Sequence, residues 1–563
     1  MISFKDGLEQ LGAPMPDFER DFVLLPLIRP YPEAPNATSP AADEFAFLDA
    51  HRPPRIAFRA QDGTDWIATT HVLPGAYPRM HDAATSPPSA QLFPIGHGAD
   101  GKPGAVSPKE IREKQWEALA SLTEANPPPT YYPPTSELDA ELDAEKRKAA
   151  RDPQLWTVVE RIVPMRSAAE QVAIDRQARP GLTLVLCHAN GFHKETYEPF
   201  AHSLVDALAA ASGNSATGSE GTRIDEIWSI DVIDSGDAGL LNARFLGRTL
   251  HWMDHTRDIH NFLRFYLPKT TASIAEEGTG STHLSPAQKG KGIAAGAPSM
   301  PNPELRPTWP PRQLPRLNDG EGLQGRRIVL LGHSFSGAAI ANLNVLQPTL
   351  TEHSILVDPV ILSSNKWEDG IVGCWPHNHM LGRGAAIRQE VWPSAQNALA
   401  SFQKKAFFAA WDPRTLDLFV RFGLRPLHPN PTPGGAGGPQ TLAMSKWREA
   451  EAFNSNWVAR YTWALLERSR GKTRESEGEG EKRERGPIHI FTMSASPGGI
   501  YCEEPDADEQ IRALVRAQGP RCSSKVLPGG HLVVQEQPAL LAAEVSNILL
   551  GKTAKPVTQK AKL

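Results

Sequence analysis

Short apolar runs separated by longer polar stretches dominate the chain from residue 156 onward. Residues 156–163 alternate apolar and polar positions like a strand, and residues 182–187 (Leu-Thr-Leu-Val-Leu-Cys) form a nearly continuous apolar run. Similar runs occupy residues 227–233, 327–331, 354–358 and 488–492. Runs of this length are typical of strands that are buried on both faces of a parallel sheet.

Helix-compatible stretches separate these predicted strands. Residues 338–346 are one example, and residues 359–487 are rich in Trp and Phe on largely helical patterns. Strands that alternate with helices predict an α/β protein with a doubly wound, mostly parallel sheet. We interpret residues 359–487 as a helical cap between the last two core strands.

Two segments with few apolar residues interrupt the pattern. Residues 268–323 are rich in Gly, Pro, Ser and Lys, which predicts a disordered surface insertion, and the charged residues 469–485 predict a flexible loop within the cap. The core then comprises residues 156–358 and 488–550, followed by a flexible tail at 551–563. Residues 1–155 contain a possible strand at 65–72 among Pro-rich joints, and we assign them as an N-terminal extension of unknown role.

Composition excludes several classes of function. The 563 residues include 59 basic and 64 acidic side chains, a formal charge of -5 that gives no electrostatic reason to expect a nucleic-acid partner. Neither the apolar run of a signal peptide nor a transmembrane segment is predicted. The four cysteines are far apart, so the sequence predicts no disulfide framework, metal site or cofactor, and it fits a reducing compartment.

The segment 332–336 (Gly-His-Ser-Phe-Ser) carries the strongest chemical signal. It lies between a predicted buried strand and a predicted helix, the context of a sharp turn that presents a nucleophilic serine, here Ser334. The usual pattern ends in Gly where this chain has Ser336, so the extra hydroxymethyl group must fit against a neighbouring strand. Small residues are tolerated there, and we predict that Ser334 is the nucleophile.

A serine nucleophile needs a base and a group that orients the base. His531 follows two glycines and precedes a predicted C-terminal helix, so a bent loop could bring it to the nucleophile. Asp358 ends a predicted strand, and the order Ser, Asp, His is the one expected for this fold. Glu503 and Glu504, after the last predicted strand, are the alternative acids.

The transition state also needs donors for a negatively charged oxygen. The N–H of Phe335, directly after the serine, is one candidate. Residues 188–192 (His-Ala-Asn-Gly-Phe) follow a predicted strand and supply the second, for which we favour Asn190 while Gly191 and Phe192 remain alternatives.

The last three residues, Ala561, Lys562 and Leu563, resemble the Ser-Lys-Leu peroxisomal address, with further lysines just upstream. This pattern predicts localisation in the peroxisomal matrix and binding of the tripeptide by the peroxisomal import receptor.

These motifs together resemble the fungal peroxisomal α/β-hydrolases, a family that includes lipase-like enzymes and hydrolases of toxin biosynthesis. The resemblance rests on residues 187–195, 228–231, 332–335 and 529–531 and on the terminal tripeptide, and it covers about residues 156–267 and 324–563. It implies a serine hydrolase that acts on an ester, a lipid or an acyl intermediate.

We therefore predict a serine hydrolase that cleaves an ester or thioester of a hydrophobic small molecule through an acyl-enzyme. A cap rich in Trp and Phe is suited to enclosing an acyl chain. Two alternatives remain: an acyltransferase that uses the same residues, and a non-catalytic binding protein on the same fold.

Overall fold

The computed structural model describes most of the predicted core. It covers residues 42–77, 154–167, 180–213, 222–269, 310–362, 375–427, 438–454, 458–470, 485–495 and 507–552, apart from residues 244, 248 and 249, together with residues 79, 170 and 174. Side chains are described from residue 46 in the first range and from residue 380 in the sixth, and that of residue 460 is not described.

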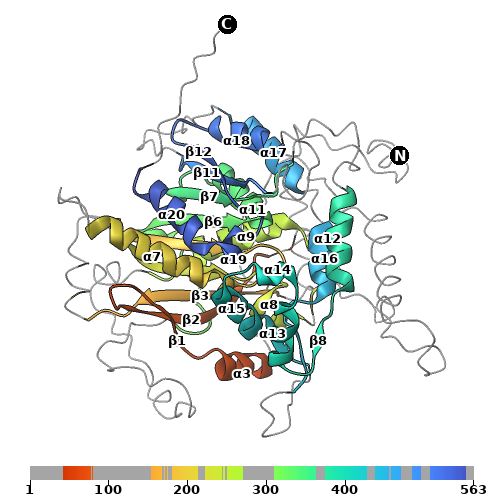
Figure 1. Cartoon of the computed structure of the whole chain (residues 1–563). Helices are drawn as coiled ribbons and strands as arrows, with labels where there is room; N and C mark the ends of the chain where they lie inside the picture. The colour runs from red at the N-terminus through yellow and green to blue at the C-terminus, as the bar shows by residue number, and fades with distance from the viewer. Residues whose placement is uncertain are drawn as a thin grey trace, which may run out of the picture.

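A nine-stranded sheet forms the centre of the molecule, with the strand order β1-β2-β3-β5-β4-β6-β7-β11-β12 (Figure 1). All pairs from β5 to β12 are parallel, and β1, β2 and β3 extend the sheet in antiparallel pairs. The predicted fold, an α/β-hydrolase fold with a mostly parallel sheet, is confirmed. The strands are β1 (Arg55–Arg59), β2 (Asp65–Pro74), β3 (Trp156–Pro164), β4 (Leu182–Cys187), β5 (Ile224–Ile230), β6 (Arg327–His333), β7 (His353–Val357), β11 (Ile488–Met493) and β12 (Ser523–Leu527).

Helices cover both faces of this sheet. Within β4, Leu184 and Leu186 belong to an apolar cluster that includes α7 (Glu198–Gly213) and α20 (Pro538–Leu549), whereas Val185 lies in a second cluster on the opposite face. Both faces of the strand are therefore buried, which explains its nearly continuous apolar run. The second face is covered by α9 (Trp252–Asn261), α11 (Phe335–Leu346), α17 (Val458–Arg468) and α18 (Ala507–Arg516).

The sheet begins well before residue 156, where we expected the core to start. Strands β1 and β2 lie within the predicted N-terminal extension, and β2 pairs with β3 from Trp66 to Pro74. The helix α3 (Ala42–His51) precedes them and packs through Leu48 against Val72 and Trp156. Part of the N-terminal extension is thus an integral part of the nine-stranded sheet.

The predicted disordered insertion at 268–323 is partly ordered. The backbone N–H of Val72 donates to Arg312 O at 2.7 Å, and the N–H of Leu314 donates to Val72 O at 2.8 Å. Leu314 is buried in the core, which explains why this end of a polar segment is held on the sheet. The prediction of disorder is wrong for residues 310–323, and residues 270–309 lie outside the described ranges.

The helical insertion follows β7 and ends at β11, so it lies one strand earlier than predicted, because β12 follows β11 as an edge strand. The sequence of β12, Ser-Ser-Lys-Val-Leu, is polar and half exposed, which is why the apolar pattern did not indicate it. The insertion contains α12 (Trp375–Ile387), β8 (Val391–Trp392), α13 (Ala395–Gln403), α14 (Ala406–Ala409), α15 (Pro413–Gly423), β9 (Leu424–Pro426), β10 (Gln440–Leu442), α16 (Lys446–Asn454) and α17.

Within the part of the chain that the structure describes, no helix has the length and apolarity needed to cross a bilayer. The same residues contain no group of three His, Cys, Asp or Glu side chains placed to share a metal ion.

Candidate active site

Ser334 occupies a strained turn between β6 and α11. Its φ angle is +61°, and Asp358 is the only other non-glycine residue with positive φ among those the structure describes. Gly332 permits this turn, because a Cβ there would approach Ser336 O to 2.4 Å. The N–H of Ser334 donates to Val357 O at 3.0 Å, which ties the turn to the end of β7. Strain of this kind is retained mainly where function requires it.

The structure brings Asp358 and His531 together, although they are far apart in the sequence. Asp358 Oδ2 accepts a hydrogen bond from His531 Nδ1 at 2.6 Å, while its Oδ1 accepts the N–H of Met493 at 3.3 Å. A carboxylate partner keeps the proton on Nδ1, so Nε2 is the basic nitrogen of the neutral ring. The alternative acids, Glu503 and Glu504, lie outside the described residues.

The loop of His531 begins directly after β12. Gly529 has a φ of +116°, a conformation that favours glycine, and its carbonyl accepts the N–H of Ala495 at 2.9 Å. The His531 ring lies beside His333, the residue before Ser334, with 5.0 Å between the ring centroids. His531 therefore lies next to the strained turn, and its side chain is mostly buried, with 12% exposed.

Two backbone N–H groups remain as candidate donors in the loop after β4. The N–H of Ala189 donates to Tyr197 Oη at 3.2 Å and that of Phe192 donates to Ala189 O at 3.3 Å. Among the described residues, Asn190 and Gly191 have no acceptor for their backbone N–H. Phe192 is thus the weakest of the three predicted candidates. On the other side of Ser334, Phe335 is the first residue of α11, whose N–H has no partner within the helix.

The side chain of Asn190 serves a different purpose from its backbone. Its Nδ2 donates to Glu449 O on α16 at 3.0 Å, which ties the loop to the helical insertion. Gly191 has a φ of +81°, and a Cβ there would come within 2.8 Å of Glu449 Oε1. The positive φ therefore favours glycine at this position.

Ser336, the departure from the usual glycine, is a hydrogen-bonding residue. Its hydroxyl donates to His188 O at 2.5 Å and lies 3.0 Å from His255 Nε2. Burial lowers the pKa of His255 to about 3, so the ring is neutral and its Nε2–H donates to the hydroxyl. Ser336 thus holds the carbonyl at the start of the loop after β4.

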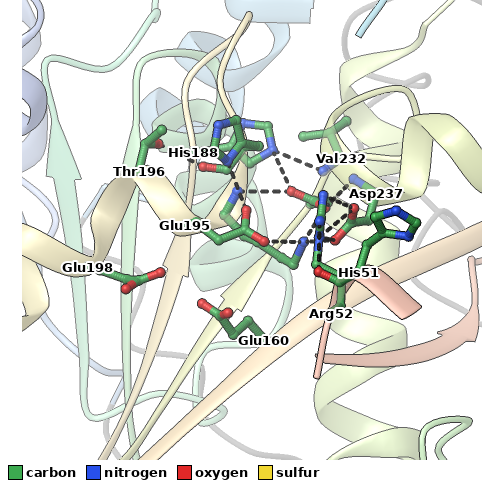
Figure 2. Close-up of polar contacts among 12 residues, drawn as sticks. His51, Arg52, Glu160, His188, Glu195, Thr196, Glu198, Val232 and Asp237 are labelled. Carbon is green, nitrogen blue, oxygen red and sulfur yellow. Dashed lines mark hydrogen bonds and ion pairs between the residues drawn. The ribbon is translucent and has the colours of Figure 1, made fainter. Parts of the chain in front are cut away.

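A buried network of charges lies beside the same loop (Figure 2). Lys194, in the short helix η4 (Lys194–Tyr197), is fully buried, and its Nζ lies 3.0 Å from Asp231 Oδ2, 2.7 Å from Asp237 Oδ2 and 2.8 Å from Glu195 Oε1. Burial alone would lower the pKa of Lys194, but these carboxylates raise it well above its usual value. Lys194 is therefore charged, and it fixes η4 to the end of β5.

The N-terminal segment completes this network. Arg52 donates to both oxygens of Asp237 at 3.0 and 3.1 Å, and Arg55 reaches Glu160 at 2.7 Å and Glu198. From the sequence alone we assigned no role to residues 1–155. The burial of these partners could not be anticipated, because their positions are separated by more than a hundred residues.

An aromatic cluster in the helical insertion packs against the loop after β4. Phe192 packs at 5.4 Å from Trp411 and 6.1 Å from Phe419, measured between ring centroids, and Leu532, next to His531, contacts the same cluster. The surroundings of the candidate site are therefore strongly apolar. The other large members are Trp392, Phe402, Phe408, Leu416, Val420, Leu424 and Leu442.

Several relatives of this chain are known, although no family model matches it. A type I acyl-CoA thioesterase, mpaH of Penicillium roqueforti, is 26% identical over 294 residues, which cover 50% of this chain and 51% of that protein. The peroxisomal membrane protein LPX1 of Saccharomyces cerevisiae is 26% identical over 200 residues, 36% of each chain. The matched regions span about half, or less, of the length of these relatives.

Among solved structures, the peroxisomal α/β-hydrolase Lpx1 of Saccharomyces cerevisiae aligns with a TM-score of 0.45 at 17% identity, over 72% of this chain and 85% of that chain. By sequence similarity, the chain resembles the fungal peroxisomal α/β-hydrolases.

Proposed function

We propose that this protein is a serine hydrolase that cleaves an ester or thioester of a hydrophobic acyl group. The observation that carries the proposal is the 2.6 Å hydrogen bond between His531 Nδ1 and Asp358 Oδ2, beside the strained turn of Ser334. In a catalytic triad a carboxylate orients a histidine, and the histidine activates a nearby serine hydroxyl for attack on an acyl carbonyl.

The proposed reaction has two steps. Ser334 Oγ attacks the carbonyl carbon while His531 Nε2 takes its proton, and Asp358 stabilises the imidazolium that forms. The oxyanion accepts the N–H groups of Phe335 and Asn190. His531 then protonates the leaving alcohol or thiol, and water releases the acyl group from Ser334 by the same sequence of proton transfers.

The apolar surroundings support a hydrophobic acyl group as the substrate. Phe192 follows the proposed donor Asn190 and lies in the aromatic cluster of the insertion, and Leu532 links that cluster to the histidine loop. Apolar side chains enclose an acyl chain at lower cost than a sugar or a charged group. The thioesterase relative supports a thioester among the candidate substrates.

Localisation in the peroxisomal matrix is part of the proposal, and it is supported by the peroxisomal yeast relative. The tripeptide Ala561, Lys562 and Leu563 lies outside the described residues. A fluorescent fusion to the N-terminus should co-localise with a peroxisomal marker and become diffuse when these residues are removed. An unchanged distribution would exclude the tripeptide as the receptor-binding signal.

Hydrolysis of p-nitrophenyl esters and acyl-CoA thioesters of increasing chain length tests the proposed activity. We expect wild-type protein to prefer long acyl chains and Ser334→Ala to lose about a thousandfold or more in kcat. Ser546→Ala is the matched control and should retain wild-type rates. Ser546 is a buried serine on α20, and its hydroxyl donates to Ala543 O of the same helix. Retained activity in Ser334→Ala would exclude the proposed mechanism.

Product analysis separates hydrolysis from acyl transfer by the same residues. Release of free acid in the absence of an added alcohol or thiol supports the hydrolase, whereas turnover that requires an acceptor supports an acyltransferase. A well-folded wild-type protein that cleaves no ester or thioester would favour a non-catalytic binding role.

A further inference from the structure

A continuous chain of buried hydrogen bonds joins the loop of Asn190 to the loop of His531. The N–H of Ala189 donates to Tyr197 Oη at 3.2 Å, the same hydroxyl lies 2.9 Å from His333 Nδ1, and His333 Nε2 lies 2.7 Å from His531 O. Tyr197 and His333 are buried, with 1% and 0% of their surfaces exposed. Neither residue has a role in the reaction steps given above.

The donor and the acceptor of each hydrogen bond in this network follow from the groups that the bond joins. A carbonyl oxygen only accepts, so His333 Nε2 carries the proton that is donated to His531 O. In a neutral ring Nδ1 must then accept, and the Tyr197 hydroxyl donates to it. The Tyr197 oxygen keeps a lone pair for the N–H of Ala189. Every donor and acceptor in the chain is therefore satisfied in a single arrangement.

The charge states of both side chains support this arrangement. Burial lowers the pKa of His333 well below its usual value, and the nearby His531 lowers it further, so the ring stays neutral. Burial raises the pKa of the Tyr197 hydroxyl, which keeps its proton. The network therefore contains a neutral imidazole and a protonated phenol hydroxyl, as the assigned directions require.

We propose that Tyr197 and His333 are positioning residues that fix the loop of the oxyanion donors relative to the loop of the general base. This inference rests on the proposed hydrolase function. Ala189 immediately precedes Asn190, and the His531 carbonyl belongs to the residue that takes the proton from Ser334. A shift of either loop would separate the two groups that must act on the same carbonyl, and a displacement of about 1 Å can cost roughly a hundredfold in rate.

Tyr197→Phe removes one hydroxyl and leaves the ring in place. We expect kcat to fall by roughly ten- to a hundredfold, with KM within about threefold of wild type, because the bond affects the geometry of the chemical step and not the acyl pocket. Tyr266→Phe, at a tyrosine of equal burial in η5 (Phe262–Tyr266), is the matched control and should retain kcat. A Tyr197→Phe variant with wild-type kcat would overturn the inference.

A double-mutant cycle distinguishes a connected chain from two separate packing roles. His333→Asn keeps an acceptor near Tyr197 but is too short to reach His531 O. We expect Tyr197→Phe combined with His333→Asn to lose no more activity than the more damaging single variant, because either change interrupts the same chain. Losses that multiply in the double variant would contradict the inference.

Thermal unfolding of each variant checks that the fold is retained. If Tyr197→Phe does not fold, we would use His333→Gln in the comparison. The Gln side chain lacks the acceptor for the Tyr197 hydroxyl but keeps a donor for His531 O. A wild-type protein without hydrolase activity would contradict the proposed function, whereas an active wild type with unaffected variants would contradict only the positioning role.

Discussion

Backbone strain marks two of the three proposed catalytic residues. Ser334 has a φ of +61° and Asp358 a φ of +40°, and each such conformation costs roughly 1–3 kcal/mol in a residue with a side chain. The two positions are linked, because Ser334 donates to Val357 O and Asp358 follows directly. The sheet thus links the strained residues at the ends of β6 and β7, and the Asp358 side chain bonds to His531.

Asp358→Asn tests the role of the acid at the residue scale. An amide in this position can donate to Nδ1 and so favour the wrong tautomer of His531, which should lower kcat by roughly a thousand- to ten-thousandfold with little change in stability. Asp234→Asn is a suitable control, because Asp234 is also a buried acid and its Oδ1 accepts a hydrogen bond from Ser235 Oγ at 3.0 Å, which the amide oxygen of Asn can accept as well.

Steady-state ester hydrolysis measures both variants, and the control should stay within about twofold of wild type. A large loss in Glu503→Gln or Glu504→Gln together with normal activity in Asp358→Asn would move the acid to the segment after β11.

At the scale of elements, local patterns and distant pairings differ in how well they could be predicted. The strands β4, β6 and β11 have apolar runs because both faces are covered, and the motifs of Ser334 and His531 are local in sequence. The edge strands β1 and β12 are half exposed, so they lack such runs. The bonds of Lys194, Tyr197 and Ser336 depend on which strands become neighbours, and no local pattern contains that information.

The N-terminal segment between α3 and β1 is predicted to be necessary for stability, through the ion pair between Arg52 and Asp237. Both side chains are buried, at 8% and 1% exposure. Arg52→Ala removes one of the cations that pair with the buried Asp237 carboxylate. The substitution should therefore lower the free energy of unfolding by roughly 3–5 kcal/mol. Arg59→Ala, which breaks an exposed ion pair with Asp65, is the matched control.

Urea unfolding followed by circular dichroism measures this difference. We expect Arg59→Ala to unfold at nearly the wild-type midpoint, since exposed ion pairs contribute little. Equal midpoints for the two arginine variants would mean that the N-terminal contacts are not part of the cooperative core.

At the scale of the whole molecule, neutral buried histidines are spread over the fold. Burial lowers the pKa of each below its usual value of 6.5, in four cases to about 3, while the unfolded chain binds protons normally. Their contribution to stability is therefore present above about pH 6.5 and is lost as the pH falls toward 3. They are His71, His188, His255, His333 and His489.

His71 allows this effect to be measured away from the candidate site. His71→Asn keeps a donor for Pro311 O, which accepts from His71 Nδ1 at 2.9 Å, but removes the titrating ring. The free energy of unfolding should decrease for both proteins when the pH is lowered from 7 to 5. The decrease should be roughly 2 kcal/mol smaller for the variant than for wild type. His51→Asn, at an exposed histidine, should leave the wild-type difference unchanged, and an equal pH response in the His71 variant would exclude this contribution.

Covalent labelling of the purified protein by a fluorophosphonate, located by peptide mass spectrometry, tests directly whether Ser334 is an activated nucleophile. We expect one adduct, on Ser334, that is absent from Ser334→Ala and formed far more slowly in His531→Ala. Labelling at another serine, or no labelling of a well-folded wild-type protein, would contradict this expectation.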